Sequence, residues 1–397
     1  MRCCTVTKNF IVIVVLLSCS TACVADDRTQ LPSFLQNSYF GVTGGLAHFA
    51  YTDASLEPNF HSTGISRDVF AVRLYFGHYF NPYLAAQIGF MGAIKRPQYH
   101  GVTAPHSANP VRTTFLNFTL KPTLPINDWF ALYGEGGVTT VSREGFTTST
   151  KTTALPDAFL VSPLTGLGAI VRLNQNWHID MGTTYIWAHD SYHQPSALYA
   201  LAGLYYLFTP AHHASQAVTP SRYYFPAHMV EFGFCDQNVF YWNPSHFLPS
   251  PLFYGGSIKV ARGAYLMYEQ NFYHTERWFS FDWGVSVGRW ISHKNHEEFY
   301  TFSIFPALRL WLVHSASADL YFAYSVAGPA VLTRRVIDER DAGSYFTFQD
   351  YLGIGMFLGK SKCLNLSLKL LHYSNGNVLP KNPGISAPVS FNIGYTW

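Results

Sequence analysis

The chain has 397 residues and a net charge of +3 that is spread along its length, without the basic block that nucleic-acid binding would need. Charged residues make up only 12 %, about half the usual share, and aromatic residues reach 17 %. No run of 18 or more apolar residues occurs beyond the N-terminus, which excludes a membrane-crossing helix. Together these features indicate an all-β protein that crosses a membrane with strands.

The first 25 residues have the layout of a signal peptide. Two basic residues precede the apolar run FIVIVVLL, and the small residues SCSTACVA follow. We expect cleavage after Ala25, although LLSC also fits a lipobox with a lipidated Cys19. Cleavage after Ala25 leaves Cys235 and Cys363, which are too few for a disulfide scaffold. The sequence leaves open whether these two cysteines pair.

From Tyr39 onward, the chain repeats segments in which apolar and polar residues alternate, separated by Gly, Pro, Asn and Asp turns. VFAVRLYFG near the N-terminus, FSFDWGVSVG and TFSIFPALRLWL all follow this pattern. In a membrane barrel the apolar face meets lipid and the polar face fills the lumen. Arg73 and Arg309 lie on the polar faces, so we expect them in the lumen.

Eight such segments occur twice, and the segment TPAHHASQAVTPSRYYFP between them reads as a linker. The first set lies near 38–51, 67–80, 82–95, 111–124, 128–142, 157–173, 176–189 and 196–208. The second lies near 226–236, 253–269, 277–291, 298–313, 317–328, 344–359, 362–374 and 387–397. Each set closes with an alternating strand and a final aromatic residue, Phe208 or Trp397. We therefore predict two tandem eight-stranded antiparallel barrels, 35–208 and 226–397, joined by 209–225; the alternative is one sixteen-stranded barrel.

An even number of strands places both ends of a barrel on the periplasmic side of the bacterial outer membrane. In the second set the outward connections are long, at 237–252, 292–297, 329–343 and 375–386, whereas the inner turn at 360–362 is short. This asymmetry is typical of outer-membrane barrels.

The seventh strand of the second set, KCLNLSLKLLHYSN, carries leucines on its lipid face and ends that face with His372 and Ser374. Lys369 has the opposite parity and points into the lumen. A spacing of two places the Cβ atoms of His372 and Ser374 roughly 6.5 to 7 Å apart on one face. An imidazole can bridge that gap, so the geometry permits a serine nucleophile with a histidine base. Taken alone, such a pair is more often an interfacial polar girdle.

The wider stretch HYSNGNVLPKNPG supports a catalytic role for this His-Ser pair. It resembles the signature of the lipid A 3-O-deacylase family, which is His-x-Ser-Asn followed by Asn-x-Gly. Members are eight-stranded outer-membrane barrels with a Ser-His-Glu site that faces the outer leaflet. The resemblance implies that Ser374 is the nucleophile and His372 the base. It also implies that Asn375 contributes to the oxyanion site and that Asn382 and Gly384 shape the following loop.

One position departs from the family pattern, because Ser386 stands where the acidic member of the triad is expected. A serine cannot stabilise an imidazolium as a carboxylate does. The strand SYFTFQDYLGIGMFLG offers Asp350 on its lipid face. If the hairpin turn is centred on Ser361, Asp350 lies opposite His372, with Cβ atoms about 4.5–5.5 Å apart. The alternatives are an interfacial aspartate or a register slipped by two.

The resemblance therefore implies an outer-membrane esterase that removes an ester-linked 3-O-acyl chain from lipid A of lipopolysaccharide in the outer leaflet. No nucleotide or metal motif such as GxxxxGK, HExxH or CxxC occurs, so no cofactor is expected. The loop cations Arg334, Arg335 and Lys381 are the first candidates for binding lipid phosphates. The rival hypothesis is a catalytically silent surface barrel used in adhesion or envelope structure. Homo-oligomerisation stays open.

The first barrel resembles the small OmpA-like barrels and has no comparable site. We expect a structural or surface-binding role for it. An eight-stranded barrel is filled by its own side chains, which argues against a porin.

Overall fold

The computed structural model describes residues 28–209, 222–239, 255–275 and 278–397. The predicted signal peptide and most of the predicted linker lie outside these residues. The described chain consists of β-strands and two single-turn 3-10 helices, Asp53–Ser55 and Asp190–Tyr192. None of its helices is long and apolar enough to cross a membrane.

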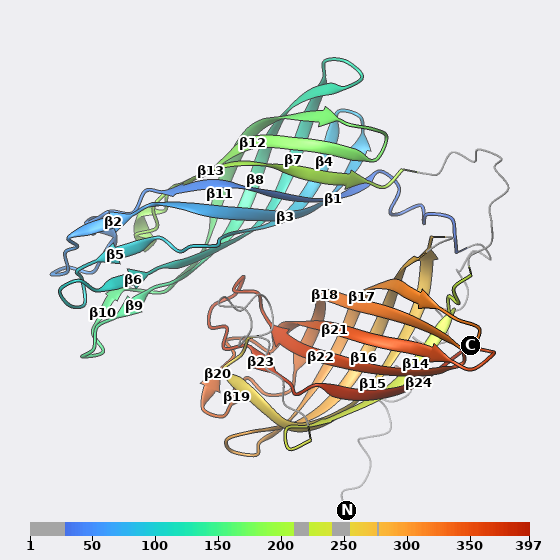
Figure 1. Cartoon of the computed structure of the whole chain (residues 1–397). Helices are drawn as coiled ribbons and strands as arrows, with labels where there is room; N and C mark the ends of the chain where they lie inside the picture. Colours follow the sequence, from blue (N-terminus) through green and yellow to red (C-terminus); the bar gives the residue numbers. More distant parts are fainter. Residues whose placement is uncertain (1–27, 210–221, 240–254, 276–277) are drawn as a thin grey trace, which may run out of the picture.

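The first half of the chain forms a closed antiparallel barrel of eight strands (Figure 1). They are β1 (Ser38–Phe49), β3 (Asp68–Asn81), β4 (Leu84–Ala93), β7 (Arg112–Pro125), β8 (Phe130–Glu144), β11 (Ala158–Arg172), β12 (Trp177–Ile186) and β13 (Ala197–Leu207). Pairing of β1 with β13 closes the ring. Beyond one end lie the short strands β2 (Gly64–Ser66), β5 (Gln98–His100), β6 (Ala108–Pro110), β9 (Phe146–Thr147) and β10 (Thr153–Leu155).

The second half forms its own ring of eight strands, which closes where β14 pairs with β15. Its strands are β14 (His228–Asp236), β15 (Ile258–His274), β16 (Phe279–Ser292), β17 (Glu298–His314), β18 (Ala318–Leu332), β21 (Phe346–Leu358), β22 (Leu364–Ser374) and β24 (Ser390–Thr396). Because each half closes on itself, the prediction of two barrels is confirmed and the sixteen-stranded alternative is wrong.

The clearest shift from the predicted strand limits occurs in β15, which begins at Ile258 and ends at His274 instead of spanning 253–269. Its register shifts between Val260 and Arg262 and again between Asn271 and Tyr273. Each such irregularity places an extra residue in one strand and disturbs the alternation from which the limits were predicted.

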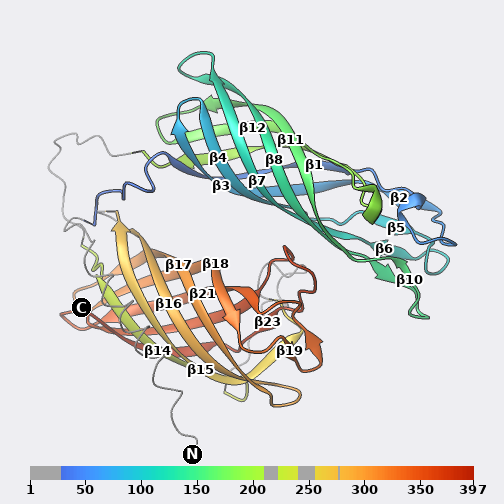
Figure 2. The ribbon, with the colours of Figure 1, turned by 180° about the vertical axis from the view of Figure 1, so that it is seen from behind.

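The outward connections of the second barrel carry three further short strands, β19 (Val336–Ile337), β20 (Arg340–Asp341) and β23 (Ile385–Ser386). In Figures 1 and 2 the long connections of both barrels lie toward the same side of the molecule, with β2, β5 and β10 on one barrel and β19 and β23 on the other. Both barrels therefore present their loops in the direction that the strand order predicts for the outside of the cell.

Side-chain exposure alternates along the barrel strands as a membrane barrel requires. On β22, Leu364, Leu366 and Leu368 are 40–42 % exposed on the outer face, whereas Asn365 and Lys369 are buried in the lumen. Apolar groups facing outward are stable when lipid covers them. The predicted lipid and lumen faces of this strand are confirmed.

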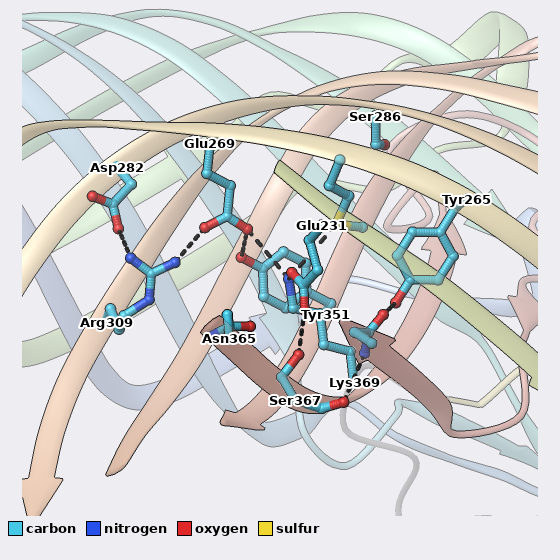
Figure 3. A network of polar contacts seen from close by, with 12 residues as sticks. Glu231, Tyr265, Glu269, Asp282, Ser286, Arg309, Tyr351, Asn365, Ser367 and Lys369 are labelled. Carbon is cyan, nitrogen blue, oxygen red and sulfur yellow. Dashed lines mark hydrogen bonds and ion pairs between the residues drawn. The ribbon is translucent and has the colours of Figure 1, made fainter. Parts of the chain in front are cut away.

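The lumen of the second barrel is filled by a network of buried charges (Figure 3). The Lys369 ammonium binds the carboxylates of Glu231 and, at 3.3 Å, Glu269. Arg309 bridges Glu269 and Asp282, the latter at 2.7 Å. Such charges are tolerated in a desolvated interior because each has opposite charges and hydrogen bonds around it.

The lumen of the first barrel is filled in the same way. Arg73 pairs with Glu135, and Lys121 binds Asp180 at 3.0 Å. The phenol groups of Tyr75 and Tyr133 also donate to Asp180, at 2.8 and 2.7 Å. The expectation that Arg73 and Arg309 point into the lumens is confirmed.

Each barrel is expected to fold without the other, because each ring closes through its own hydrogen bonds. The two halves, expressed separately with a signal peptide, should insert into the outer membrane and migrate differently on gels before and after heating. The full chain is the control for insertion. If neither half folds alone while the whole chain does, contacts between the halves are essential and this expectation is wrong.

Candidate active site

Four chemically active side chains form one row across four neighbouring strands at the outer end of the second barrel. Asp350 on β21 pairs with His372 on β22, as predicted from the short turn between these strands. His372 pairs in turn with Ser386 on β23, and Ser386 pairs with Lys259 on β15. Directly paired residues point to the same face of a sheet. The row therefore lies on the outward face that carries the exposed leucines of β22 lower down.

The row exists because β23 inserts between β22 and β15 above the point where β24 begins. β23 runs antiparallel to β22 and parallel to β15. The preceding residue, Gly384, has a φ of +62°. A Cβ there would lie 2.8 Å from the carbonyl oxygen of Gly255 and 3.5 Å from Nε2 of His372. Glycine is required at this close approach because it has no Cβ and adopts positive φ without strain.

Both ring nitrogens of His372 face oxygen atoms. Nδ1 lies 3.5 Å from Oδ2 of Asp350, and Nε2 lies 3.0 Å from the carbonyl oxygen of Gly255, to which it donates. The side chain is almost fully buried, at 3 % exposure. Two acceptors around one imidazole complement the imidazolium that arises when a histidine base accepts a proton.

Asp350 is fixed by an irregularity in the neighbouring strand. The register between β18 and β21 shifts between Ser325 and Gly328, and Ala327 within this bulge has a φ of +51°. The bulge aims the N–H of Ala327 at Oδ1 of Asp350, at 2.6 Å. A backbone amide that donates to a carboxylate makes a strong, charge-assisted hydrogen bond. The other oxygen, Oδ2, is the one that faces His372.

Ser374 is held by the loop that follows it. Its Oγ accepts hydrogen bonds from Nδ2 of Asn382 at 2.8 Å and from the N–H of Gly376 at 3.1 Å. Asn375 contributes to the same loop, since its N–H donates to Asn382 and its Nδ2 donates to the carbonyl of Lys381 at 3.4 Å. Thus Ser374 contacts Asn382, whereas the Nε2 of His372 contacts Gly255.

The outer face of β22 is less open than the alternation predicts. Beyond Leu368, exposure falls to 5 % at Leu370 and 3 % at His372. Leu370 packs with Val389, with Leu352 and Tyr324 against this pair. The sequence predicts a His372 that faces lipid directly. Instead, the chain around Gly255 and Gly384 covers it, while Ser374 stays half-exposed.

The three loop cations that were candidates for lipid phosphates are engaged in ion pairs. Arg334 lies 3.2 Å from Glu297, and Asp341 receives both Arg335 at 3.1 Å and Lys381 at 2.9 Å. The hydrogen bond from Lys381 lowers the pKa of Asp341 below its ordinary value. The pair of Lys381 and Asp341 joins the connection that contains β20 to the one that contains β23.

Within the described residues, no group of three or more His, Cys, Asp or Glu side chains is arranged to hold a metal ion. Cys235 and Cys363 are free thiols. The residues that sequence reasoning missed are Lys259, Gly255 and Ala327. Lys259 could have been noticed in the sequence as a charged residue near the outer end of a lipid-facing strand. Gly255 and Ala327 act through backbone atoms, so no sequence pattern indicates their roles.

Two closed barrels with apolar outer faces, charged lumens and long outward loops define an integral β-barrel protein of the bacterial outer membrane. Residues 262–396 match the family model of the lipid A 3-O-deacylase (PagL), and residues 35–211 match that of the OmpA-like transmembrane domain. The two matches fall on the two barrels, in the order that the sequence predicts.

Among solved structures, the outer-membrane enzyme PagL matches with 14 % identity and a TM-score of 0.32, covering 43 % of this chain and all of that one. Neisserial surface protein A matches with 12 % identity and a TM-score of 0.31, over 44 % of this chain and 98 % of that one. Ail of Yersinia pestis matches with 15 % identity and a TM-score of 0.29, over 43 % and 99 %. No curated protein sequence matches.

Proposed function

We propose that the C-terminal barrel hydrolyses the ester-linked 3-O-acyl chain of lipid A, with Ser374 as nucleophile, His372 as base and Asp350 as the acidic partner of His372. The observation that carries the proposal is the fixed carboxylate. A bulge in β18 directs a backbone N–H onto Asp350, whose free oxygen lies 3.5 Å from Nδ1 of His372. Bulges that re-aim groups are frequent next to active sites.

In this mechanism the Oγ of Ser374 attacks the acyl carbonyl while Nε2 of His372 accepts its proton. Asp350 stabilises the resulting imidazolium through Nδ1–H. The tetrahedral intermediate collapses, the C–O bond to the sugar breaks, and His372 returns the proton to the sugar oxygen. Water then attacks the acyl-Ser374 ester by the same route and releases the fatty acid.

One exchange of hydrogen bonds has to precede attack. Nε2 of His372 must leave the carbonyl of Gly255, and the hydroxyl of Ser374 must turn from Asn382 toward the imidazole. The Asn375 side chain, now on the carbonyl of Lys381, is the amide that we expect to donate to the oxyanion. Ser386, directly opposite His372 on β23, has no proton-transfer role in this scheme.

The location of Ser374 suits a lipid substrate. The exposed leucines of β22 form an apolar stripe on the outer face that leads up to the row of polar residues. An acyl chain of the outer leaflet lies at this depth, with its ester at the boundary between the hydrocarbon and the polar headgroups. Lipid A could therefore approach laterally without leaving the membrane.

A catalytically silent barrel is the second candidate function. Two observations favour it: Ser386 replaces the carboxylate expected from the family signature, and Nε2 of His372 is bound to Gly255. In that case the buried polar row would serve only to join β22, β23 and β15. The N-terminal barrel, whose lumen is filled, is proposed to have a structural or surface-binding role.

The test is a mass spectrum of lipid A from cells with and without the protein. The proposed enzyme should produce lipid A that lacks one ester-linked hydroxyacyl chain, together with the free fatty acid. Expression of the separate N-terminal barrel is the matched control and should change nothing. Unchanged lipid A, from cells in which the full protein is folded in the outer membrane, would favour the silent barrel.

A further inference from the structure

One hydrogen bond crosses from the first barrel to the loop that holds Ser374. Nη1 of Arg112, the first residue of β7, donates to Oδ1 of Asn377 at 3.1 Å. Asn377 lies just after Ser374, in the connection between β22 and β23. In both views of the ribbon this connection projects toward the first barrel (Figures 1 and 2). The first barrel therefore contacts the loop beside the candidate active site.

The contact continues through two amide side chains to the proposed nucleophile. Oδ1 of Asn377 also accepts a hydrogen bond from Nδ2 of Asn382 at 3.1 Å, and the same Nδ2 donates to Oγ of Ser374 at 2.8 Å. The other end of the Asn382 amide is fixed as well, because its Oδ1 accepts the N–H of Asn375 at 3.1 Å. A continuous series of hydrogen bonds thus runs from Arg112 to the hydroxyl of Ser374.

Arg112 is itself oriented by its own barrel. It pairs directly with Glu144 across β7 and β8, and its Nη1 lies 2.9 Å from Oε2 of that residue. One hydrogen of this nitrogen serves the carboxylate, and the other serves the amide oxygen of Asn377. A charged donor makes a stronger hydrogen bond than a neutral one. The Arg112 side chain is 32 % exposed, so solvent weakens its effect without removing it.

The loop after Ser374 is held from two sides. Gly376 and Asn377 both have positive φ, +65° and +58°, which glycine and asparagine adopt with less strain than other residues. On one side, the ammonium of Lys381 binds Asp341 of the same barrel at 2.9 Å. On the other side, the loop is held by Arg112 of the first barrel. The first barrel thus supplies one of the contacts that fix this bend.

We propose that the first barrel positions the active site of the second, and that Arg112 is the residue through which it does so. The inference rests on the proposed function, because it needs Ser374 to be the nucleophile. Arg112 holds the amide oxygen of Asn377 toward Asn382, which keeps Nδ2 of Asn382 on the Ser374 hydroxyl. Since it acts through these two amides, Arg112 is a positioning residue. Reactive groups need such supporting hydrogen bonds to stay in a productive geometry.

The orientation of the Asn382 amide matters because Ser374 has to give its proton to His372. While Nδ2 of Asn382 donates to Oγ of Ser374, the hydroxyl proton stays available to a base. Oδ1 of Asn382 lies 3.2 Å from the same Oγ. In a looser loop this acceptor competes with His372 for the proton. We therefore expect a looser loop to slow the attack step without preventing the lipid from binding.

The experiment compares steady-state deacylation of lipid A by the full chain and its variants in detergent micelles. Arg112→Met removes the charge and the donor at similar length. It should lower kcat about three- to tenfold and leave KM nearly constant, because one partly exposed charged hydrogen bond is lost. Arg112→Lys retains a charged donor and should recover part of the rate. An unchanged kcat, a raised kcat, or a loss that appears only in KM would overturn the proposal.

Arg172→Met is the matched control. Arg172 is an exposed arginine at the far end of the same barrel, where its guanidinium donates to the carbonyl of Asp128 at 3.3 Å. The same substitution there should leave kcat and KM unchanged. If it slows deacylation as much as Arg112→Met does, a general effect on the first barrel explains both, and the assigned role of Arg112 is wrong.

Two changes at Asn377 test whether Arg112 acts through this residue. Asn377→Gly removes the amide oxygen but keeps the positive φ without strain, so it should lower kcat at least as much as Arg112→Met. Asn377→Asp keeps an oxygen for both Arg112 and Asn382 and should stay near the wild-type rate. The double variant Arg112→Met/Asn377→Gly should match Asn377→Gly alone, because coupled residues are not additive. Losses that multiply would show that the two residues act independently.

Hydrogen exchange of the loop separates this inference from the proposed function, because it needs no substrate. In the full chain, Arg112→Met should speed exchange about three- to tenfold at the N–H groups of Asn375 and Gly376, which donate to Asn382 and Ser374, whereas Arg172→Met should not. Deacylation with unchanged exchange and unchanged kcat overturns this inference alone. Faster exchange with unchanged kcat also overturns it, since the contact would then be merely structural. Faster exchange in a protein that never deacylates overturns the proposed function, and the positioning role with it, while the contact between the barrels stands.

Discussion

Replacing Ser374 with alanine is expected to abolish the release of an acyl chain from lipid A, lowering the rate by at least about 10³-fold. The reason is that the variant lacks the hydroxyl proposed to attack the ester at the outer end of β22, where the exposed leucine stripe meets the polar row. His372→Asn should have an effect of similar size, since the nucleophile then lacks its base. The measurement is mass spectrometry of lipid A after timed incubation with purified protein.

Ser361→Ala is the matched control, because Ser361 is an exposed serine in the turn at the opposite end of the same hairpin. All three variants should keep the heat-dependent gel shift of the wild type, which shows that the barrel is folded. Residual deacylation near the wild-type rate in Ser374→Ala or His372→Asn would remove that residue from the mechanism.

Asp350→Asn is expected to slow deacylation by about 10²- to 10⁴-fold without unfolding the barrel. The asparagine oxygen can still accept the N–H of Ala327, so the bulge in β18 stays supported. The amide carries no charge, however, and cannot stabilise the imidazolium of His372. The measurement is kcat for lipid A with wild type and variant at equal amounts of folded protein.

The two neighbours of His372 provide a sharper version of this experiment. Asp350 and Ser386 are its direct partners on opposite sides, on β21 and β23. Ser386→Ala should change the rate little, whereas Ser386→Glu in the Asp350→Asn background should restore part of it by supplying a carboxylate from the other strand. A near-normal rate in Asp350→Asn would show that a Ser-His dyad suffices.

Much of this site follows from the sequence because strand registers are strongly constrained. Side chains alternate with a period of two, so a short turn fixes which residues of a hairpin face each other. The turn at 360–362 therefore predicts that Asp350 lies opposite His372, and the structure has this register. The alternating leucines of β22 likewise predict its lipid face.

The remaining features depend on contacts between residues far apart in the chain. The parallel pairing of β23 with β15 brings Lys259 into the row across more than a hundred residues, and no local pattern encodes it. The bulge at Ala327 and the cover over His372 arise from backbone atoms, whose placement hydrophobic alternation does not report. Because of the chain that covers it, His372 is buried instead of facing lipid directly.

The small size of β23 has a mechanical consequence. It joins β22 and β15 through two residue pairs on each side, whereas β24 and β14 pair through six residues below it. At the outer edge of the barrel, the join between β22 and β15 through β23 is thus short, whereas the part of the wall below it is continuous. Few hydrogen bonds resist its separation, and local opening of a protein requires less free energy where fewer contacts are broken. We therefore expect this edge to open locally more readily than the part of the wall that β24 and β14 form below it.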